Sequence, residues 1–253
     1  MIILAVTQAR YGSTRFPGKI LNEVNGLSLL EIHLRRIQQS QLISKIKVAT
    51  TNEPESNRIE QIASNLGIES YHGSIENVLE RFYLTALPES PDWVVRLTSD
   101  CPLVDPGVID EVIQHALDHN LDYVSNTLLV PTFPDGLDVE VFKFSSLRVA
   151  NEQAKLLSEK EHVTPFIWKN SSLMGGELFT SDVIKNTVDL SGVRITVDTT
   201  EDFEVIKELI EREGIDSPWM RYVEILEEQP HIRLKNQYYS RNEGYDKSLN
   251  EDN

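Results

Sequence analysis

Short apolar runs alternate with segments of helical periodicity through the first half of this chain, and the alternation restricts the folds open to it. We expect strands at 2–6, 45–50, 68–73, 92–98 and 122–126, and helices at 27–39, 55–67, 76–87 and 106–120. Strands that alternate with helices form a parallel sheet covered on both faces. The chain has 253 residues, enough for one large domain or two small ones and for a substantial core. The pattern therefore predicts an α/β fold.

The regular alternation of predicted strands and helices ends at about residue 127. We expect further strands at 137–142, 177–180 and 193–198, and amphipathic helices at 200–214 and 218–230. We predict one domain over 1–215 that carries an arm at about 127–180. A C-terminal helix and an acidic tail follow in 216–253. The last stretch, 236–253, has no apolar periodicity, so we expect it to be mobile.

The charge balance and the cysteine count exclude several classes of protein. A net charge of −16 repels nucleic-acid backbones, so we expect no nucleic-acid partner. The single cysteine, Cys101, excludes an internal disulfide and a multi-cysteine metal site, and it suits a reducing compartment. No apolar run is long enough to span a membrane, and the N-terminus lacks the features of a signal peptide. We expect a cytoplasmic protein without a membrane partner.

A cationic loop follows the first predicted strand, although the chain as a whole is acidic. The stretch "ARYGSTRFPGK" at 9–19 contains three cations, Arg10, Arg15 and Lys19. Ligands of open α/β sheets bind beyond the carboxyl ends of strands. Glycines free backbone amides to approach an oxyanion, and arginine grips phosphate with a planar fork. The loop predicts a polyphosphate site, with further help from Gly12, Gly18, Ser13 and Thr14. The alternative is a basic turn that solvates the rim of the sheet.

The loop is not a known glycine-rich phosphate motif. A Walker A loop has four residues between its glycines and Ser or Thr after its lysine. Here five residues separate Gly12 from Gly18, and Ile20 follows Lys19. The dinucleotide pattern G-x-G-x-x-G is also absent. A P-loop enzyme and a dinucleotide-binding enzyme are therefore both disfavoured.

Six stretches together resemble one family of enzymes. They are "AVTQARYGSTRFPGKIL" (5–21), "NVLERFY" (77–83), "VVRLTSDCPLVDP" (94–106), "FPDGLDVEVF" (133–142), "EHVTPFIW" (161–168) and "ITVDTTEDFEVI" (195–206). In this order they resemble the sugar-activating cytidylyltransferases, which include the acylneuraminate and KDO cytidylyltransferases. The resemblance is closest to the branch of the spore-coat polysaccharide biosynthesis protein F, and it spans roughly residues 2–210.

The resemblance implies a fold, an activity and a set of site residues. The fold would be the Rossmann-like three-layer nucleotidyltransferase fold, with a mainly parallel sheet and a small dimerisation arm that implies a homodimer. The activity would join CTP to a sugar acid or related acceptor and release pyrophosphate, with Mg²⁺ as cofactor. By resemblance, the nucleotide would be bound by Arg10, Gly12, Ser13, Arg15, Lys19, Arg81 and Ser99. Lys19, Arg10 and Asp100 would be catalytic, and Asp138, Glu140 and His162 would contact the acceptor, although the resemblance also allows Asp138 and Glu140 to lie at a dimer interface.

Two aspartates follow predicted strands and are candidates for the metal. Asp100 follows "VVRLTS" and Asp198 follows "VRITV". If both strands belong to one parallel sheet, both carboxylates emerge at the same edge, where they could hold Mg²⁺. The resemblance assigns the metal to the same two positions. The alternatives are a turn at Asp100 and a helix N-cap at Asp198.

Two arginines lie in apolar surroundings. Arg81 lies beside the apolar stripe of its predicted helix, where it is either solvated or, by resemblance, near cytosine or phosphate. Arg96 lies inside an apolar strand, so it should have a carboxylate or a ligand as partner.

The acceptor residues also have alternatives. Asp138 and Glu140 are two apart on a predicted strand and share a face, which could simply be an exposed face. His162 is an acceptor group or a structural histidine, and Ser158 with Glu161 has capping-box spacing. Relatives often carry Arg where this chain has Lys160, a change that weakens a bidentate grip on a carboxylate.

We expect a Mg²⁺-dependent nucleotidyltransferase in which an acceptor oxygen attacks the α-phosphate in line and pyrophosphate leaves. Catalysis would consist mostly of positioning and charge neutralisation. One alternative is a metal-dependent glycosyltransferase, although the chain has no D-x-D motif. The others are a non-catalytic nucleotide-sensing subunit and an interaction protein that uses its arm and acidic tail.

Overall fold

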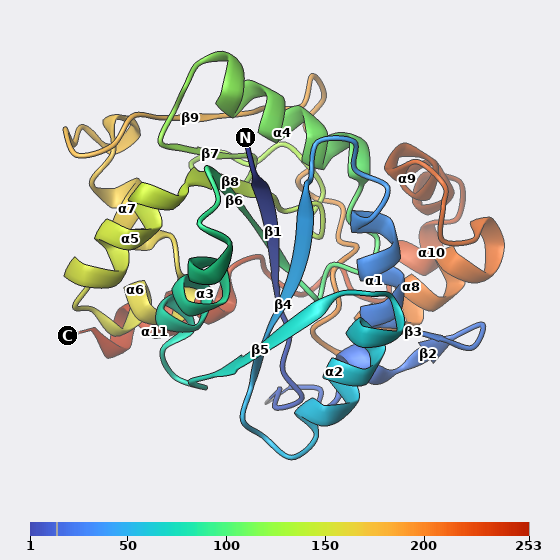
Figure 1. Ribbon diagram of the computed structural model, residues 1–253. Coiled ribbons are helices and arrows are strands. Elements are labelled where there is room, and N and C mark those ends of the chain that lie inside the picture. Colours follow the sequence, from blue (N-terminus) through green and yellow to red (C-terminus); the bar gives the residue numbers. More distant parts are fainter. Residues whose placement is uncertain (14, 253) are drawn as a thin grey trace.

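The computed structural model describes residues 1–13 and 15–252, and it shows a twisted sheet between two layers of helices (Figure 1). The seven strands lie in the order β5-β4-β1-β6-β8-β7-β9. Their bounds are β1 Ile3–Gln8, β4 Lys45–Thr51, β5 Glu69–Gly73, β6 Trp93–Thr98, β7 Tyr123–Ser125, β8 Glu140–Lys143 and β9 Ser181–Val183. A separate hairpin consists of β2 (Glu23–Val24) and β3 (Leu27–Ser28). The predicted α/β fold with a mainly parallel sheet is confirmed.

The direction of the strands defines one functional edge. β1 pairs in parallel with β4 and β6, β4 with β5, and β7 with β9. β8 runs antiparallel between β6 and β7. The carboxyl ends of six strands therefore meet at one edge of the sheet, and β8 begins at that edge. This edge is where ligands of open α/β sheets bind.

Helices cover both faces because the central strands are apolar on both. In β1, Ile3 and Ala5 point into one apolar cluster, and Leu4 and Val6 point into another. The first cluster includes α1 (Leu29–Ile37), α2 (Ser56–Asn65), α4 (Pro106–Asp118), α8 (Thr200–Glu213) and α9 (Trp219–Glu228). The second includes α3 (Val78–Ala86), α5 (Phe144–Gln153) and α7 (Pro165–Lys169). The remaining helices are α6 (Leu157–His162), α10 (Pro230–Arg233), α11 (Glu243–Glu251) and the short 3₁₀ helices η1 (Lys19–Leu21), η2 (Leu87–Glu89) and η3 (Ser172–Met174).

The strands predicted at 177–180 and 193–198 are wrong. Within them the structure has only isolated bridges, Phe179 to Ser171 and Arg194 to Asp135, and β9 begins at Ser181. The stretch 193–198 does not join the sheet because its backbone bonds to loops. The amide of Ile195 donates to the carbonyl of Asp135 at 2.7 Å. Alternating apolar residues indicate that every second side chain is buried. An extended segment that crosses the end of a sheet buries its side chains in the same way, so this pattern does not distinguish it from a strand of the sheet.

The stretch expected to form an arm at 127–180 is largely part of the main body. β8 lies inside the sheet, and α5, α6 and α7 pack against α3 or one another, on the left of the sheet in Figure 1. Phe142, Leu147 and Ile167 are fully buried there. These side chains complete the second apolar cluster, which explains why the segment does not stand apart.

The terminal stretch, which has no apolar periodicity and which we expect to be mobile, contains α11, and this helix packs against α6. Only Ser248 of this helix is buried, so its sequence has no apolar stripe from which the helix could be predicted. Tyr245 instead contacts the rings of His162 and Trp168, at centroid distances of 5.1 and 6.1 Å. The helix is thus held by aromatic and polar contacts with distant residues, which apolar periodicity does not detect.

Candidate active site

The cationic loop leaves the carboxyl end of β1 and turns back into η1. Gly18 has a φ of 69°, and a Cβ atom there would lie 2.8 Å from the ring of Tyr11. Its amide donates to the carbonyl of Tyr11 at 2.9 Å, which closes the loop. The hydroxyl of Ser13 accepts from the amide of Phe16 at 3.4 Å. Gly18 is therefore required by the backbone, whereas Thr14, another predicted contributor, lies outside the described residues.

Lys19 lies between the two predicted metal ligands. Its Nζ is 3.2 Å from Oδ2 of Asp100 and 2.8 Å from Oδ1 of Asp198. Burial lowers the pKa of Lys19, but the two carboxylates outweigh it and raise the pKa above its ordinary value. Burial likewise raises the pKa of Asp100, but Lys19 and the hydroxyl of Thr98 outweigh it and hold the pKa at about 2. The ammonium of Lys19 thus faces two carboxyl groups at the edge of the sheet.

The two aspartates reach this position by different routes. Asp100 follows β6 after the buried Ser99, whose amide donates to the carbonyl of Gln8 at 3.2 Å. We expected Asp198 to lie at the end of a strand of the sheet, but the described residues immediately before it form no sheet strand. The amide of Val197 donates to the carbonyl of Asp100 at 2.7 Å and so brings the second carboxylate alongside the first.

The helix that follows Asp198 holds it in place without using it as a cap. Thr199 is the N-cap of α8, and Thr199 and Asp202 form a reciprocal capping box. The amide of Asp198 donates to Oδ2 of Asp202 at 2.9 Å. The helix-cap alternative for Asp198 is therefore wrong, and its carboxylate is turned toward Lys19.

Arg15 and Arg194 also bind Asp198. Their guanidinium groups lie 3.0 and 3.1 Å from its Oδ2 atom. Arg194 also pairs with Asp135 at 2.6 Å and with Asp202 at 2.8 Å. We did not predict a role for Arg194. The available signal was a cation inside an apolar run, the same signal that drew attention to Arg96.

Arg81 and Arg10 carry charge without a close carboxylate. Arg81 is only 2% exposed, donates to the carbonyl of Ser74 and leaves its Nε without a partner. Burial, and then the nearby Arg10, lower the pKa of Arg81 to about 10. Among the described residues, neither guanidinium lies within 4.0 Å of a carboxylate oxygen. The solvated alternative for Arg81 is wrong, and the pair of cations suits an anionic ligand.

Glu140 is part of a buried cluster. It is 6% exposed and accepts from Arg96, and from the hydroxyls of Tyr123 and Thr164 at 2.6 Å each. The carboxylate partner expected for Arg96 is therefore confirmed. The exposed-face alternative is wrong for Glu140, whose partners lie on β6, on β7 and just after α6. Its neighbour Asp138 instead pairs with Arg241.

His162 lies beside this cluster, under α11. Its Nε2 is 2.9 Å from the hydroxyl of Ser248, and burial and the charge of Arg96 lower its pKa to about 4. Val163 follows with a φ of 71°, a strained conformation for a β-branched residue, and the amide of Thr164 donates to the carbonyl of His162 at 2.8 Å. The tight turn directs His162 and Thr164 toward the Glu140 cluster.

The capping box predicted from the spacing of Ser158 and Glu161 is wrong. Ser158 lies inside α6, and Glu159 accepts from the amides at the start of that helix. Glu161 accepts from the hydroxyl of Ser248 at 2.6 Å.

Asp100 and Asp198 are suitable ligands for a Mg²⁺ ion that the phosphates of a substrate also coordinate. Among residues 1–13 and 15–252, no three His, Cys, Asp or Glu side chains are grouped so as to hold a metal ion. Mg²⁺ prefers oxygen, keeps several waters, and is commonly bound through one or two carboxylates and the phosphates of a substrate. Asp100 and Asp198 supply two carboxylates of that kind beside the cationic loop.

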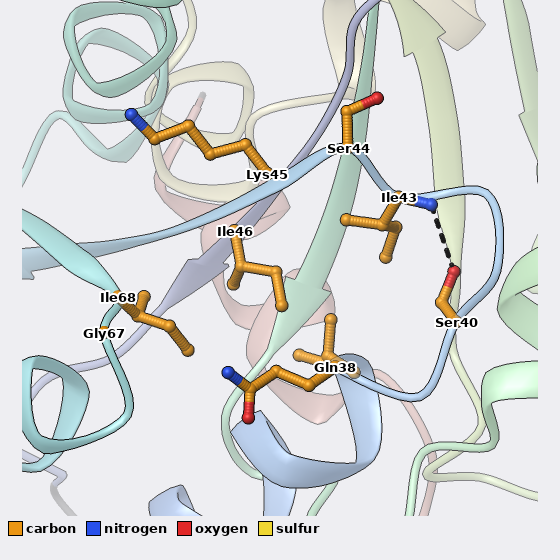
Figure 2. A pocket seen from close by; sticks show the side chains of 9 residues that line it. Gln38, Ser40, Ile43, Ser44, Lys45, Ile46, Gly67 and Ile68 are labelled. Atoms are coloured by element: carbon orange, nitrogen blue, oxygen red, sulfur yellow. Dashed lines mark hydrogen bonds between the residues drawn. The ribbon is translucent and has the colours of Figure 1, made fainter.

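A pocket of about 280 Å³ lies away from this site (Figure 2). It is lined where α1 ends and β4 and β5 begin, by Ile37, Gln38, Ser40, Ile43, Ser44, Lys45, Ile46, Gly67 and Ile68. The hydroxyl of Ser40 accepts from the amide of Ile43 there at 3.3 Å. This is the amino-terminal side of the sheet, and none of the predicted site residues lines it.

Comparison with known proteins decides the family. The profile of the cytidylyltransferase family matches residues 4–243. The chain belongs to the cytidylyltransferase family. It is 35% identical to an uncharacterized protein of Methanocaldococcus jannaschii over 92% of this chain and 93% of that protein. It is 32% identical to the spore coat polysaccharide biosynthesis protein SpsF of Bacillus subtilis, over 84% and 88% of the two chains.

Cytidylyltransferases with known structures share the fold. A cytidylyltransferase from Leptospira borgpetersenii matches with a TM-score of 0.87 and 30% identity, over 95% of this chain and 100% of that one. A shorter match, in amino-acid sequence, is to the 3-deoxy-manno-octulosonate cytidylyltransferase of Geobacter metallireducens. The two are 33% identical over 45% of this chain and 44% of the relative. No helix among the described residues has the length and apolarity needed to cross a membrane.

Proposed function

We propose that this cytidylyltransferase activates a sugar acid or a related acceptor with CTP and Mg²⁺, giving a CMP-linked product and pyrophosphate for surface polysaccharide or glycan biosynthesis. The observation that carries the proposal is the position of Lys19 between Asp100 and Asp198, beside the cationic loop. The similarity to SpsF and to a 3-deoxy-manno-octulosonate cytidylyltransferase supports the class of acceptor.

The triphosphate binds the loop through Arg10, Arg15, Lys19 and the amides near Gly12 and Ser13. The guanidinium of Arg81 is buried and its Nε has no partner. An anion that reaches it can therefore form a charge-assisted hydrogen bond, and no existing ion pair has to be broken. Ser99 is buried beside the end of β1 and borders the same space. These groups hold the α-phosphate in a fixed orientation, which is the main contribution that positioning makes to such a reaction.

Asp100 and Asp198 would hold Mg²⁺ together with the phosphates. Bound there, the ion would neutralise phosphate charge and stabilise the pyrophosphate that leaves. Lys19 offsets part of the charge of the two carboxylates, and with the ion in place its ammonium would be free to turn toward a phosphate.

The acceptor lies on the side of Asp138 and His162, where Glu140 fixes the surrounding side chains. The oxygen of its hydroxyl attacks the α-phosphate in line and the hydroxyl proton passes to water, while the bond from the α-phosphorus to the bridging oxygen breaks and pyrophosphate departs with the electron pair of that bond. No enzyme nucleophile is required. Burial, and then Asp100, raise the pKa of the Cys101 thiol well above its usual range, which removes the one cysteine as a candidate.

The test is release of pyrophosphate from CTP in the presence of Mg²⁺ and a panel of acceptors led by KDO and other nonulosonic acids. UTP, GTP and ATP serve as controls for the base. We expect release that depends on both CTP and one class of acceptor. Mg²⁺-dependent CTP binding without release would contradict the acceptor class, and an absence of triphosphate binding would contradict the function.

A further inference from the structure

The segment from Ser240 to Glu251, here called the C-terminal strap, contacts three separate parts of the candidate site. Oε2 of Glu243 is 2.7 Å from Nη1 of Arg15 in the phosphate-binding loop. Arg241 pairs with Asp138 on the acceptor side. Ser248 is 2.9 Å from Nε2 of His162. One short segment therefore engages the nucleotide side and the acceptor side together.

The chemistry of these contacts is that of substrate groups. The carboxylate of Glu243 occupies the guanidinium that would bind a phosphate, and both anions use the same fork of donors. The guanidinium of Arg241 covers Asp138 and also donates to the carbonyl of Phe133 at 3.2 Å. A bound triphosphate carries several negative charges, so it and Glu243 cannot share Arg15 without strong repulsion.

The contact between the strap and the cationic loop is easily exchanged, whereas the pair of Arg241 with Asp138 is more buried. The side chains of Arg15 and Glu243 are 39% and 43% exposed, and exposed ion pairs contribute little to stability. Only Ser248 of α11 is buried, while Tyr245 supplies the aromatic contacts to α6 and α7. A segment with few buried apolar side chains opens at low cost compared with the core.

We propose that the C-terminal strap is an autoinhibitory closure, and that a triphosphate displaces it by taking Arg15 from Glu243. Release of the strap also removes Arg241 from Asp138 and uncovers the acceptor side, so the nucleotide opens the way for the second substrate. The inference rests on the proposed function. The closed strap lowers the apparent affinity for CTP by the fraction of molecules that are open.

The experiment compares four proteins by calorimetry with CTP and with inorganic tripolyphosphate. They are the unaltered chain, Glu243→Gln, a chain that ends at Tyr239, and the control Glu251→Gln. Glu251 lies on the same helix and pairs only weakly with Lys247, at 3.9 Å, so this change matches the charge without touching the loop. We expect both ligands to bind about two- to five-fold more tightly to Glu243→Gln, and more tightly still to the shortened chain. The control should bind as the unaltered chain does.

Hydrogen exchange separates strap release from a simple gain in attraction. On addition of CTP to the unaltered chain, amides in 243–251 should exchange faster. If the variants bind CTP more tightly but the amides of 243–251 in the unaltered chain do not exchange faster, the autoinhibitory role of the strap is contradicted. Equal binding of CTP by all four proteins also contradicts it. Neither result contradicts the proposed function. Weaker binding by the shortened chain would make the strap part of the binding site and also overturns the inference. An absence of binding to every protein overturns both proposals.

Discussion

At the scale of single residues, the site depends on how charge is balanced around Lys19. Lys19 is the cation that Asp100 and Asp198 share, while Arg15 and Arg194 contact Asp198 alone. Without the shared ammonium the two carboxylates repel each other more strongly, and a divalent ion offsets that repulsion better than water does. Lys19 therefore competes with a metal ion for Asp100 and Asp198 as long as no phosphate draws it away.

Replacing Lys19 with methionine should separate metal binding from catalysis. Without the ammonium, Mg²⁺ or Mn²⁺ should bind more tightly in the absence of nucleotide, because the two carboxylates lose their competing partner. Turnover, measured as kcat/KM for CTP, should fall at least about 100-fold because one donor to the transition state is lost. Calorimetry with Mn²⁺ measures the first effect. Lys235→Met, which removes a lysine paired with Glu204 and Glu208 on α8, is the control. Metal affinity that does not change in Lys19→Met contradicts this account.

His33 makes stability depend on pH. It is fully buried, and since a carbonyl can only accept, its Nδ1 donates to Cys101 while its Nε2 accepts from Thr7 at 2.7 Å. Burial lowers its pKa to about 4, below the ordinary 6.5. The unfolded chain therefore binds the proton more tightly, and the stabilisation that is complete above pH 6.5 is lost as the pH falls toward 4.

The loss from this one group should be about 3 kcal/mol in the free energy of unfolding. Urea denaturation at several pH values measures it. His33→Gln should flatten the slope in this window, whatever its effect at neutral pH, whereas the exposed His119→Gln should leave the slope as it is. Equal slopes in all three proteins would show that His33 is not buried neutral.

At the scale of elements, the start of α8 joins Asp198, the proposed metal ligand, to the core. Asp202 is fully buried, binds Arg194 through both oxygens at 2.8 Å, and accepts from the amide of Asp198. The same carboxylate thus caps a helix, pairs a buried guanidinium and orients a predicted metal ligand. Such a network is costly to interrupt, because its remaining members stay buried without partners.

Asp202→Ala should lower the free energy of unfolding by about 3–5 kcal/mol, because it leaves the buried Arg194 short of a partner. Chemical denaturation measures the change. The neighbouring Glu201→Ala, on the exposed side of the same turn, should leave the midpoint within error. A loss below about 1 kcal/mol would mean that Asp135 and Asp198 suffice to balance Arg194.

At the scale of the whole molecule, the excess of negative charge lies outside the cationic loop. The chain carries a net charge of −16, yet Arg10, Arg15, Lys19 and Arg81 converge at one edge of the sheet. The segment expected to contribute to a dimer also exposes apolar side chains. Leu129 and Val130 are 58% and 62% exposed. We propose that this face pairs with a second copy of the chain.

Leu129→Asp combined with Val130→Asp should convert a dimer into a monomer at micromolar concentration, because charge at an apolar interface must be desolvated. Sedimentation velocity measures the state. Met220→Asp introduces a charge at an exposed apolar residue of α9 and is the control, with no expected change. A dimer that persists in the double variant places the interface elsewhere, and a monomeric unaltered chain contradicts the homodimer.

The α/β class, the cationic loop after β1 and the need for a partner at Arg96 could all be predicted from the amino-acid sequence. These follow from local periodicity and from charges in apolar runs, which a single stretch of chain displays. Only the tertiary structure decided how Asp198 reaches Asp100, since 193–198 crosses the sheet edge through bonds to loops instead of joining it. The burial of Arg81 and Glu140 and the seating of the C-terminal strap on Arg15 also required the structure. Each depends on contacts between residues far apart in the chain, where neither propensity nor spacing carries information.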